Sequence, residues 1–171
     1  MGVPIEGKCE ICGCDLVNIL EIDGDDSRLS FLDIEGKIKL PICINCAGLS
    51  EKTVIRYQGN GAGSFEIVDS FGDENYISSD SVQAIQKKHL TLSLQPKPTY
   101  YVCGCDEMPH LGGQANWIQD SQYEKCPDCG KKMKLMGSIP WESLLEDNTE
   151  GTLYLNHCSE CKVVVAFHQQ T

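Results

Sequence analysis

The chain has 171 residues, and 14 Lys and Arg against 25 Asp and Glu give it a formal net charge of −11. Hydrophobic and charged contents of 41% and 23% are typical of a folded soluble protein and exclude wholesale disorder. The acidic balance argues against non-specific binding to nucleic acid, which depends on neutralising phosphates, and it favours a basic protein partner.

No run of residues approaches the apolar length needed to cross a bilayer. The first residues, MGVPIEGKCE, lack a basic segment followed by an apolar one, so we expect a cytoplasmic protein with no membrane contact. The length suits one moderate domain or two small ones. A proline-containing segment favours two halves, residues 1–96 and 97–171.

Residues 7–48 are expected to form a small β unit. Three apolar runs predict strands, and two glycines predict turns between them. The strands are expected at residues 16–22, 28–34 and 37–42, and the turns at Gly24 and Gly36.

The cysteine-free residues 53–99 predict a mixed β/α segment. Two short apolar runs favour strands, a capped amphipathic run favours a helix, and alternating leucines favour one more strand that ends at prolines. The expected order is strand 54–57, loop 59–63, strand 65–68, helix 79–88 capped by Ser79 or Asp80, and strand 90–94.

The last part of the chain predicts a second β unit at residues 125–168. In the segment before it, Gly112-Gly113 indicates a close turn that seats Trp117 in the core. Strands are expected at residues 133–139, 151–156 and 162–167, with a turn of helix at 141–145.

Eight of the eleven cysteines stand in four C-x-x-C motifs. A C-x-x-C turn directs two thiolates to one tetrahedral cation, and a second such turn supplies the other two ligands. Thirty residues separate the first two motifs and twenty-eight separate the last two. We therefore predict two zinc ions, one held by Cys9, Cys12, Cys43 and Cys46 and the other by Cys126, Cys129, Cys158 and Cys161.

An internal repeat supports this pairing. KCEICG at residues 8–13 matches KCPDCG at 125–130, an offset of 117 residues. KLPICINC at 39–46 matches LYLNHCSEC at 153–161 as a strand that runs into the second cysteine motif. The predicted fold is mainly β with minor α, built from duplicated zinc-ribbon-like units at about residues 7–48 and 125–168.

The three remaining cysteines allow other roles. A candidate third metal site consists of Cys103, Cys105 and His110, with Cys14 as a fourth ligand. The alternative is that these three cysteines are simply buried or exposed thiols that bind no metal. The eight paired cysteines also suit iron. A redox role would need one C-x-x-C at the start of a helix in a βαβ setting, and four motifs flanked by strands do not fit that role. Because no histidine stands in a recognisable catalytic motif, we expect no enzymatic activity.

The sequence resembles the YwqG-like family of bacterial proteins of unassigned function, which is similar in its cysteine-rich parts to programmed cell death protein 2. The resemblance lies in Gly112-Gly113, then Trp117-Ile118-Gln119, then Cys126-Pro127-Asp128-Cys129-Gly130 with Met133. It implies a largely β protein with repeated halves that binds proteins. Some members look like immunity proteins, and eukaryotic relatives are similar to chaperones of a basic ribosomal protein.

The leading hypothesis is a non-enzymatic, zinc-stabilised, acidic protein-interaction module, immunity-protein-like or chaperone-like toward a basic partner. One alternative is a zinc ribbon that binds nucleic acid through Lys131, Lys132 and Lys134. The other is thiol redox or metal transfer by the extra cysteines, Cys14, Cys103 and Cys105.

Overall fold

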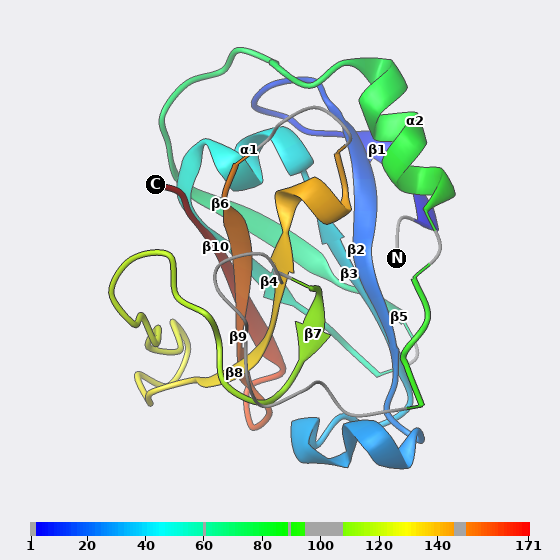
Figure 1. Ribbon diagram of the computed structural model, residues 1–171, viewed down its shortest axis with the longest axis vertical. Coiled ribbons are helices and arrows are strands. Elements are labelled where there is room, and N and C mark those ends of the chain that lie inside the picture. Colours follow the sequence, from blue (N-terminus) through cyan, green and yellow to red (C-terminus); the bar gives the residue numbers. More distant parts are fainter. Residues whose placement is uncertain (1–2, 60, 89, 95–107, 146–149) are drawn as a thin grey trace.

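A computed structural model describes residues 3–59, 61–88, 90–94, 108–145 and 150–171. The fold is mainly β with minor helix, as predicted, and it contains a four-stranded sheet, β1-β2-β3-β5, and a six-stranded sheet, β6-β4-β10-β9-β8-β7 (Figure 1). The strands are β1 (Val3–Lys8), β2 (Asp15–Asp23), β3 (Lys37–Ile42), β4 (Ser50–Arg56), β5 (Gly61–Ala62), β6 (Ser64–Ser70), β7 (His110–Leu111), β8 (Lys134–Pro140), β9 (Thr152–Cys158) and β10 (Val163–Gln169). The helical elements are η1 (Ser27–Leu32), α1 (Ile44–Gly48), α2 (Ser79–Lys87) and η2 (Trp141–Ser143).

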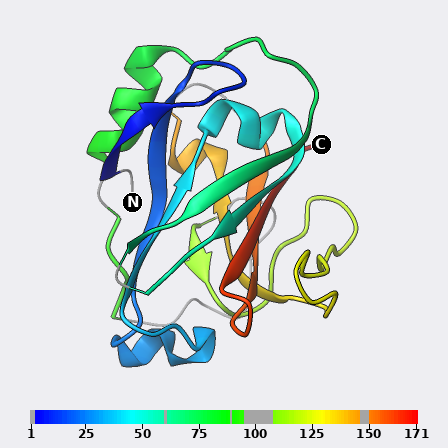
Figure 2. The ribbon, with the colours of Figure 1, turned by 180° about the vertical axis from the view of Figure 1, so that it is seen from behind.

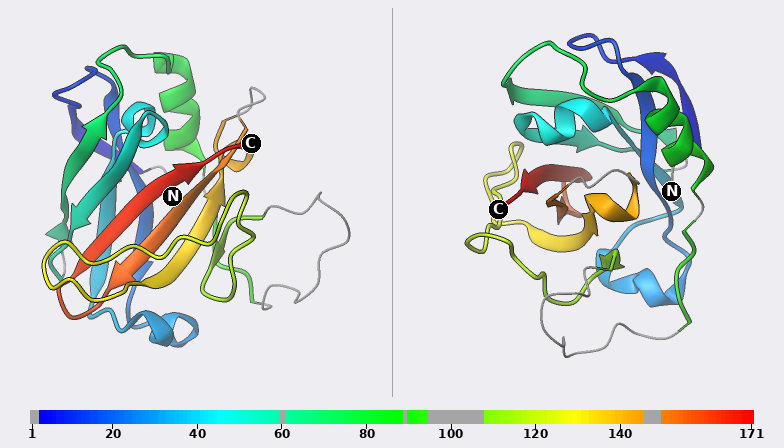
Figure 3. Two further views of the ribbon diagram at one scale, coloured as in Figure 1. Left: turned by 90° about the vertical axis from the view of Figure 1, so that its left-hand side faces the viewer. Right: turned by 45° about the horizontal axis from the view of Figure 1, so that its top comes forward.

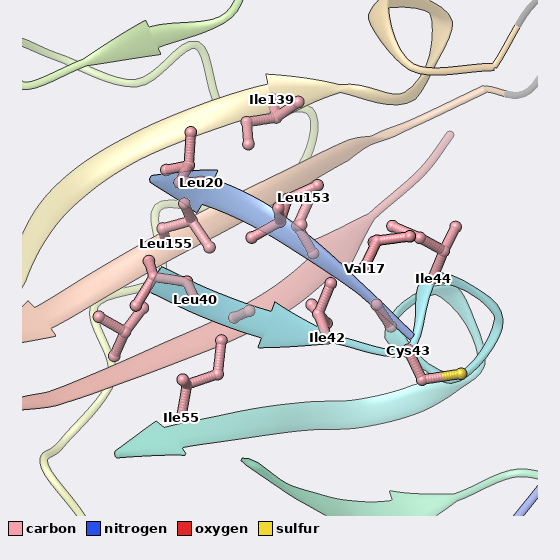
Figure 4. Packing of buried hydrophobic residues seen from close by; sticks show 14 of the residues in the cluster. Val17, Leu20, Leu40, Ile42, Cys43, Ile44, Ile55, Ile139, Leu153 and Leu155 are labelled. Carbon is pink, nitrogen blue, oxygen red and sulfur yellow. The ribbon is translucent and has the colours of Figure 1, made fainter. Parts of the chain in front are cut away.

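The two sheets pack against each other as layers and enclose the main core (Figure 3). Leu20 of β2, Leu40 of β3 and Leu155 of β9 belong to this core, and all three side chains are buried (Figure 4). Burying such side chains removes apolar surface from water, which is the main driving force for folding. The core therefore joins strands from both ends of the sequence.

The six-stranded sheet also mixes early and late segments. β4 pairs antiparallel with β10, the last strand, with Val54 opposite Val165, and the two lie side by side in Figure 2. Residues on either side of position 96 thus share one sheet. The division at residue 96 itself falls within residues 95–107, outside the described ranges, and stays a prediction.

The repeat seen in the sequence recurs in the backbone. β2 and β3 form an antiparallel pair joined through η1, and β8 and β9 form an antiparallel pair joined through η2. Each pair has one register shift, between Asn18 and Leu20 in β2 and between Leu135 and Gly137 in β8. These shifts lie 117 residues apart, the offset of the sequence repeat, so two strand–3₁₀–strand units share one plan.

The predicted strand at residues 28–34 is wrong, because residues 27–32 form the 3₁₀ helix η1. The Asp26 carboxylate caps it by accepting a hydrogen bond from the backbone N–H of Arg28. Leu29 and Leu32 are buried and Phe31 is exposed. A spacing of three matches one 3₁₀ turn, so this short helix buries one face where a strand would bury alternate residues.

The predicted strand at residues 90–94 is also wrong, since these described residues form no strand. Leu90, Leu92 and Leu94 are exposed, so no neighbouring strand covers them. The Arg28 guanidinium instead donates hydrogen bonds to the backbone carbonyls of Leu92 and Ser93. These backbone groups are therefore bound by a side chain rather than by a sheet.

The other elements lie close to their predicted positions. The predicted helix is α2, although its N-cap is Ser78, whose hydroxyl accepts a hydrogen bond from the N–H of Ser81. The predicted loop at residues 59–63 contains the short strand β5, parallel to β3. Trp117 is half-buried and stacks on Tyr154 at a ring-centroid distance of 4.6 Å. Among the described residues, none of the helices has the length and apolar character needed to span a membrane.

Candidate metal centres

The first cysteine cluster comprises Cys9, Cys12, Cys43 and Cys46, and their four sulfurs all lie within 4.8 Å of one another. Sγ–Sγ separations are 3.7 Å for Cys9 and Cys46, 3.5 Å for Cys12 and Cys43, and 3.6 Å for Cys12 and Cys46. Four sulfurs at about 2.3 Å from a tetrahedral zinc lie about 3.8 Å apart. The cluster has the size of a four-thiolate metal site.

Backbone turns position the first two sulfurs. The Gly13 N–H donates to the Cys9 carbonyl at 2.9 Å, and the Cys9 N–H donates to the Cys14 carbonyl at 2.8 Å. Gly13 has φ +72°, the left-handed region that glycine adopts without a side-chain clash. The turn between β1 and β2 therefore brings Cys9 and Cys12 to the same side.

The other two sulfurs come from the start of α1. Cys43 is the N-cap residue, and its Sγ accepts a hydrogen bond from the Cys46 N–H at 3.5 Å. One helical turn then places Cys46 beside Cys43. Because β3 runs directly into this helix, the sheet fixes where the pair meets Cys9 and Cys12.

The second cluster comprises Cys126, Cys129, Cys158 and Cys161, also within 4.8 Å of one another. Cys129 and Cys158 are 3.9 Å apart at Sγ. The Gly130 N–H donates to the Cys126 carbonyl, and the Cys126 N–H donates to the Lys131 carbonyl, each at 2.8 Å. These bonds repeat those of the first cluster 117 residues later, and Gly130 has the matching φ of +71°.

Cys158 and Cys161 lie at the turn that joins β9 to β10, so here no helix separates the two strands. The segments that carry the two clusters lie toward opposite ends of the long axis of the molecule (Figures 1 and 2). All eight cysteines are free thiols, with sulfur–sulfur distances well beyond the roughly 2.05 Å of a disulfide. Disulfide bridges therefore do not account for either cluster.

Burial and close contact between the sulfurs raise the pKa of two of the thiols. Burial raises the pKa of the Cys46 thiol to about 12, and contact with Cys129 together with burial raises the pKa of Cys161 to about 12. In the metal-free chain these sulfurs keep their protons at neutral pH. A cation must displace those protons, so metal uptake releases protons and acid opposes it.

Cys14 lies beside the first cluster. Its thiol donates to the Asp15 carbonyl at 3.6 Å, and its hydrogen bond with Cys43 lowers the pKa of Cys14 to about 7 and raises that of Cys43. His110, another member of the candidate third site, lies in β7 with Nδ1 3.0 Å from the Ser138 hydroxyl. Cys103 and Cys105 lie outside the described residues, so the third site stays a prediction.

The fold and the clusters define a mainly β protein with two four-cysteine groups that fit metal ions. The chain is 25% identical, over 178 residues and 96% of its length, to the uncharacterised protein YpfL of Salmonella typhimurium (strain LT2). It spans about 39% of the length of that relative. No family model and no solved structure matches the chain. The resemblance to the YwqG-like family therefore stays a prediction.

Proposed function

We propose that the chain is a non-enzymatic module, stabilised by two zinc ions, whose acidic surface binds a basic protein partner. The observation that carries the proposal is the set of two complete four-sulfur clusters. Catalytic zinc sites keep an open position and three protein ligands, whereas structural sites are closed by four. Four sulfurs in each cluster suit the structural role.

The charge of the surface supports a basic partner. The chain carries a formal −11, and within the described part of the chain seven of its 14 Lys and Arg residues form ion pairs with carboxylates. The paired cations are Lys8, Arg28, Lys37, Lys39, Lys52, Arg56 and Lys131. The surplus carboxylates favour association with positive charge.

The same pairing weakens the nucleic-acid alternative. Lys131 forms an ion pair with Glu160, with Nζ 2.6 Å from a carboxylate oxygen. The Lys132 ammonium lies over the Tyr123 ring, 4.5 Å from its centroid. Two of the three lysines that suggested a basic face are thus engaged locally, whereas phosphate binding needs available cations.

The test is affinity capture followed by measurement with purified components. Immobilised zinc-loaded protein would capture soluble proteins from its source cells, and each captured protein would be purified and titrated calorimetrically at low and high salt. We expect a basic partner whose affinity falls about tenfold or more over this change, because salt screens exposed charges. A purified partner that is not basic, or binding indifferent to salt, would contradict the proposal.

A matched variant separates surface charge from folding. Glu10, Asp25 and Asp73 are exposed, and their carboxylates form no ion pair within the described ranges. The triple variant Glu10→Gln, Asp25→Asn and Asp73→Asn should bind the partner more weakly, while its melting temperature stays within a few degrees of that of the unaltered protein. Lys87→Ala, which makes the chain more acidic from α2, is the control and should leave binding unchanged or slightly stronger.

A further inference from the structure

A hollow of about 290 Å³ lies near the second cluster and is lined by three separate segments. Asp33 and Glu35 follow η1, Tyr57 and Gly59 follow β4, and Ser159 and Lys162 belong to the turn between β9 and β10. Figures 1 and 2 show η1 and this turn at the same end of the molecule. The fold thus brings together polar residues more than one hundred positions apart in the sequence.

The hollow carries both signs of charge. The Asp33 and Glu35 carboxylates provide negative charge and the Lys162 ammonium provides positive charge. None of these three side chains makes a hydrogen bond or ion pair to another described residue. The two carboxylates and the ammonium group that line this small concave surface are therefore available to bind a ligand.

Tyr57 gives the hollow a fixed wall. Its side chain is 4% exposed, and its hydroxyl is 2.5 Å from Nε2 of the buried His157. The Tyr57 N–H donates to the Lys162 carbonyl at 3.0 Å. These two bonds tie the end of β4 to β9 and to the β9–β10 turn, so the backbone segments that carry Tyr57 and Lys162 are held together before any ligand binds.

Lys162 occupies a backbone position that favours glycine. Gly13 and Gly130 directly follow the second cysteine of their C-x-x-C motifs, with φ of +72° and +71°. Lys162 follows Cys161 in the same way, with φ +57°. A side chain in this left-handed region costs free energy that glycine avoids, so the lysine is not explained by the turn alone.

We propose that this hollow binds a small zwitterion, with the ligand's ammonium group at Asp33 and Glu35 and its carboxylate at Lys162 and the Ser159 hydroxyl. Charge-assisted hydrogen bonds to both ends would select a molecule that carries both groups over one that carries either alone. A free α-amino acid is the simplest member of this class. The site is independent of the protein partner proposed above.

The test uses the full zinc-loaded chain, labelled with ¹⁵N, titrated with each standard L-amino acid. We expect at least one to shift the amide signals of Gly59, Ser159 and Lys162 with a dissociation constant of about 1 mM or lower. The matched amine without the carboxylate, and the matched acid without the amine, should each bind about tenfold more weakly or worse. If no amino acid shifts these signals at about 10 mM, or if the amine alone binds as well, the proposal is wrong.

Lys162→Gly separates binding from folding. Glycine suits φ +57° and removes the ammonium group, so binding should fall about tenfold or more while the melting temperature stays the same or rises by about 2 °C. Asp33→Asn, which keeps the side-chain shape, should weaken binding similarly. Lys87→Ala on α2 removes one positive charge elsewhere and should leave binding unchanged. Retained affinity in Lys162→Gly, or a large fall in its melting temperature, would overturn the proposed role of the lysine.

Discussion

The two cysteine clusters have the same ligand set but different surroundings. In the first, Cys9, Cys43 and Cys46 are each at most 4% exposed and belong to the main core between the sheets, and the half-buried Cys12 packs against that core. In the second, Cys126 is buried, whereas Cys129 is exposed. The second cluster borders a small satellite core that includes Val54 and Val165.

The two clusters offer the same four sulfur ligands, but their different surroundings predict different structural roles for a bound cation. A cation in the first cluster would hold together β1, β2, β3 and α1, whose side chains also build the main core. A cation in the second would join the Cys126–Cys129 turn to the end of the β9–β10 hairpin. We expect the first site to be tied to folding of the whole chain and the second to act as a local clamp.

The largest effect is expected for Cys43→Ser. It removes a buried ligand from the first cluster, and structural zinc supplies folding free energy comparable to the whole stability of a domain. We expect a loss of about 5 kcal/mol or more, seen as loss of near-UV circular dichroism and of the cooperative thermal transition. Cys14→Ser, which changes a neighbouring thiol outside the quartet, should keep the fold and both metal ions.

Cys129→Ser should have a smaller effect, because it opens the exposed cluster. Twenty-eight residues separate Cys129 from Cys158, and a cross-link over a loop of that length contributes about 2–4 kcal/mol. We expect a folded protein with one metal ion and a lower melting temperature, measured by calorimetry alongside metal analysis. Complete unfolding, equal to that of Cys43→Ser, would remove the distinction between the two sites.

Metal release should also distinguish the clusters. A chelator reaches an exposed sulfur directly, whereas a buried cluster must first open, and core regions open only with free energies near that of global unfolding. We would add excess chelator and follow metal release with a metal-sensitive dye. We expect two phases of metal release with equal amplitude and with rates that differ about tenfold or more. Cys129→Ser should lack the fast phase; if it lacks the slow phase instead, the assignment is reversed.

The smallest effect is expected from pH. Burial lowers the pKa of His168, which lies in β10 with its ring 5.8 Å from that of Trp141. Since the folded pKa is below the ordinary value of 6.5, the unfolded chain takes up this proton first as the pH falls. This contribution to stability is therefore full above pH 6.5 and is lost as the pH falls through the folded pKa.

His168→Gln should flatten the fall in melting temperature below pH 6.5 when metal content is held constant. His157, whose pKa burial lowers to about 4, is present in both proteins, so its contribution cancels in the difference. Identical slopes in the two proteins would show that His168 does not contribute.

Local signals in the sequence were sufficient for much of this structure. The spacing of the four C-x-x-C motifs predicts two four-cysteine clusters, and apolar runs predict β2, β3, β9 and β10 within two residues of their observed ends. At residues 28–34 the same kind of apolar run fails. The signals for η1 are the Asp26 cap and the spacing of three between Leu29 and Leu32.

The remaining features depend on distant contacts that no short window contains. The pairing of β4 with β10 joins Val54 to Val165, and it depends on the satellite core that these two side chains share rather than on either strand alone. The unequal burial of the clusters has the same origin, because the main core closes over Cys43 and leaves Cys129 at the surface. The hollow around Lys162 likewise exists only once the two sheets have packed.

Native mass spectrometry of the untagged protein, with elemental analysis of the same sample, tests the central proposal most directly. We expect two zinc ions per chain, with eight protons displaced by them, and stepwise loss of the ions that unfolds the chain as the second one leaves. A folded chain that carries no metal, with all eight cysteine thiols protonated, would contradict the proposal that the two clusters are metal sites.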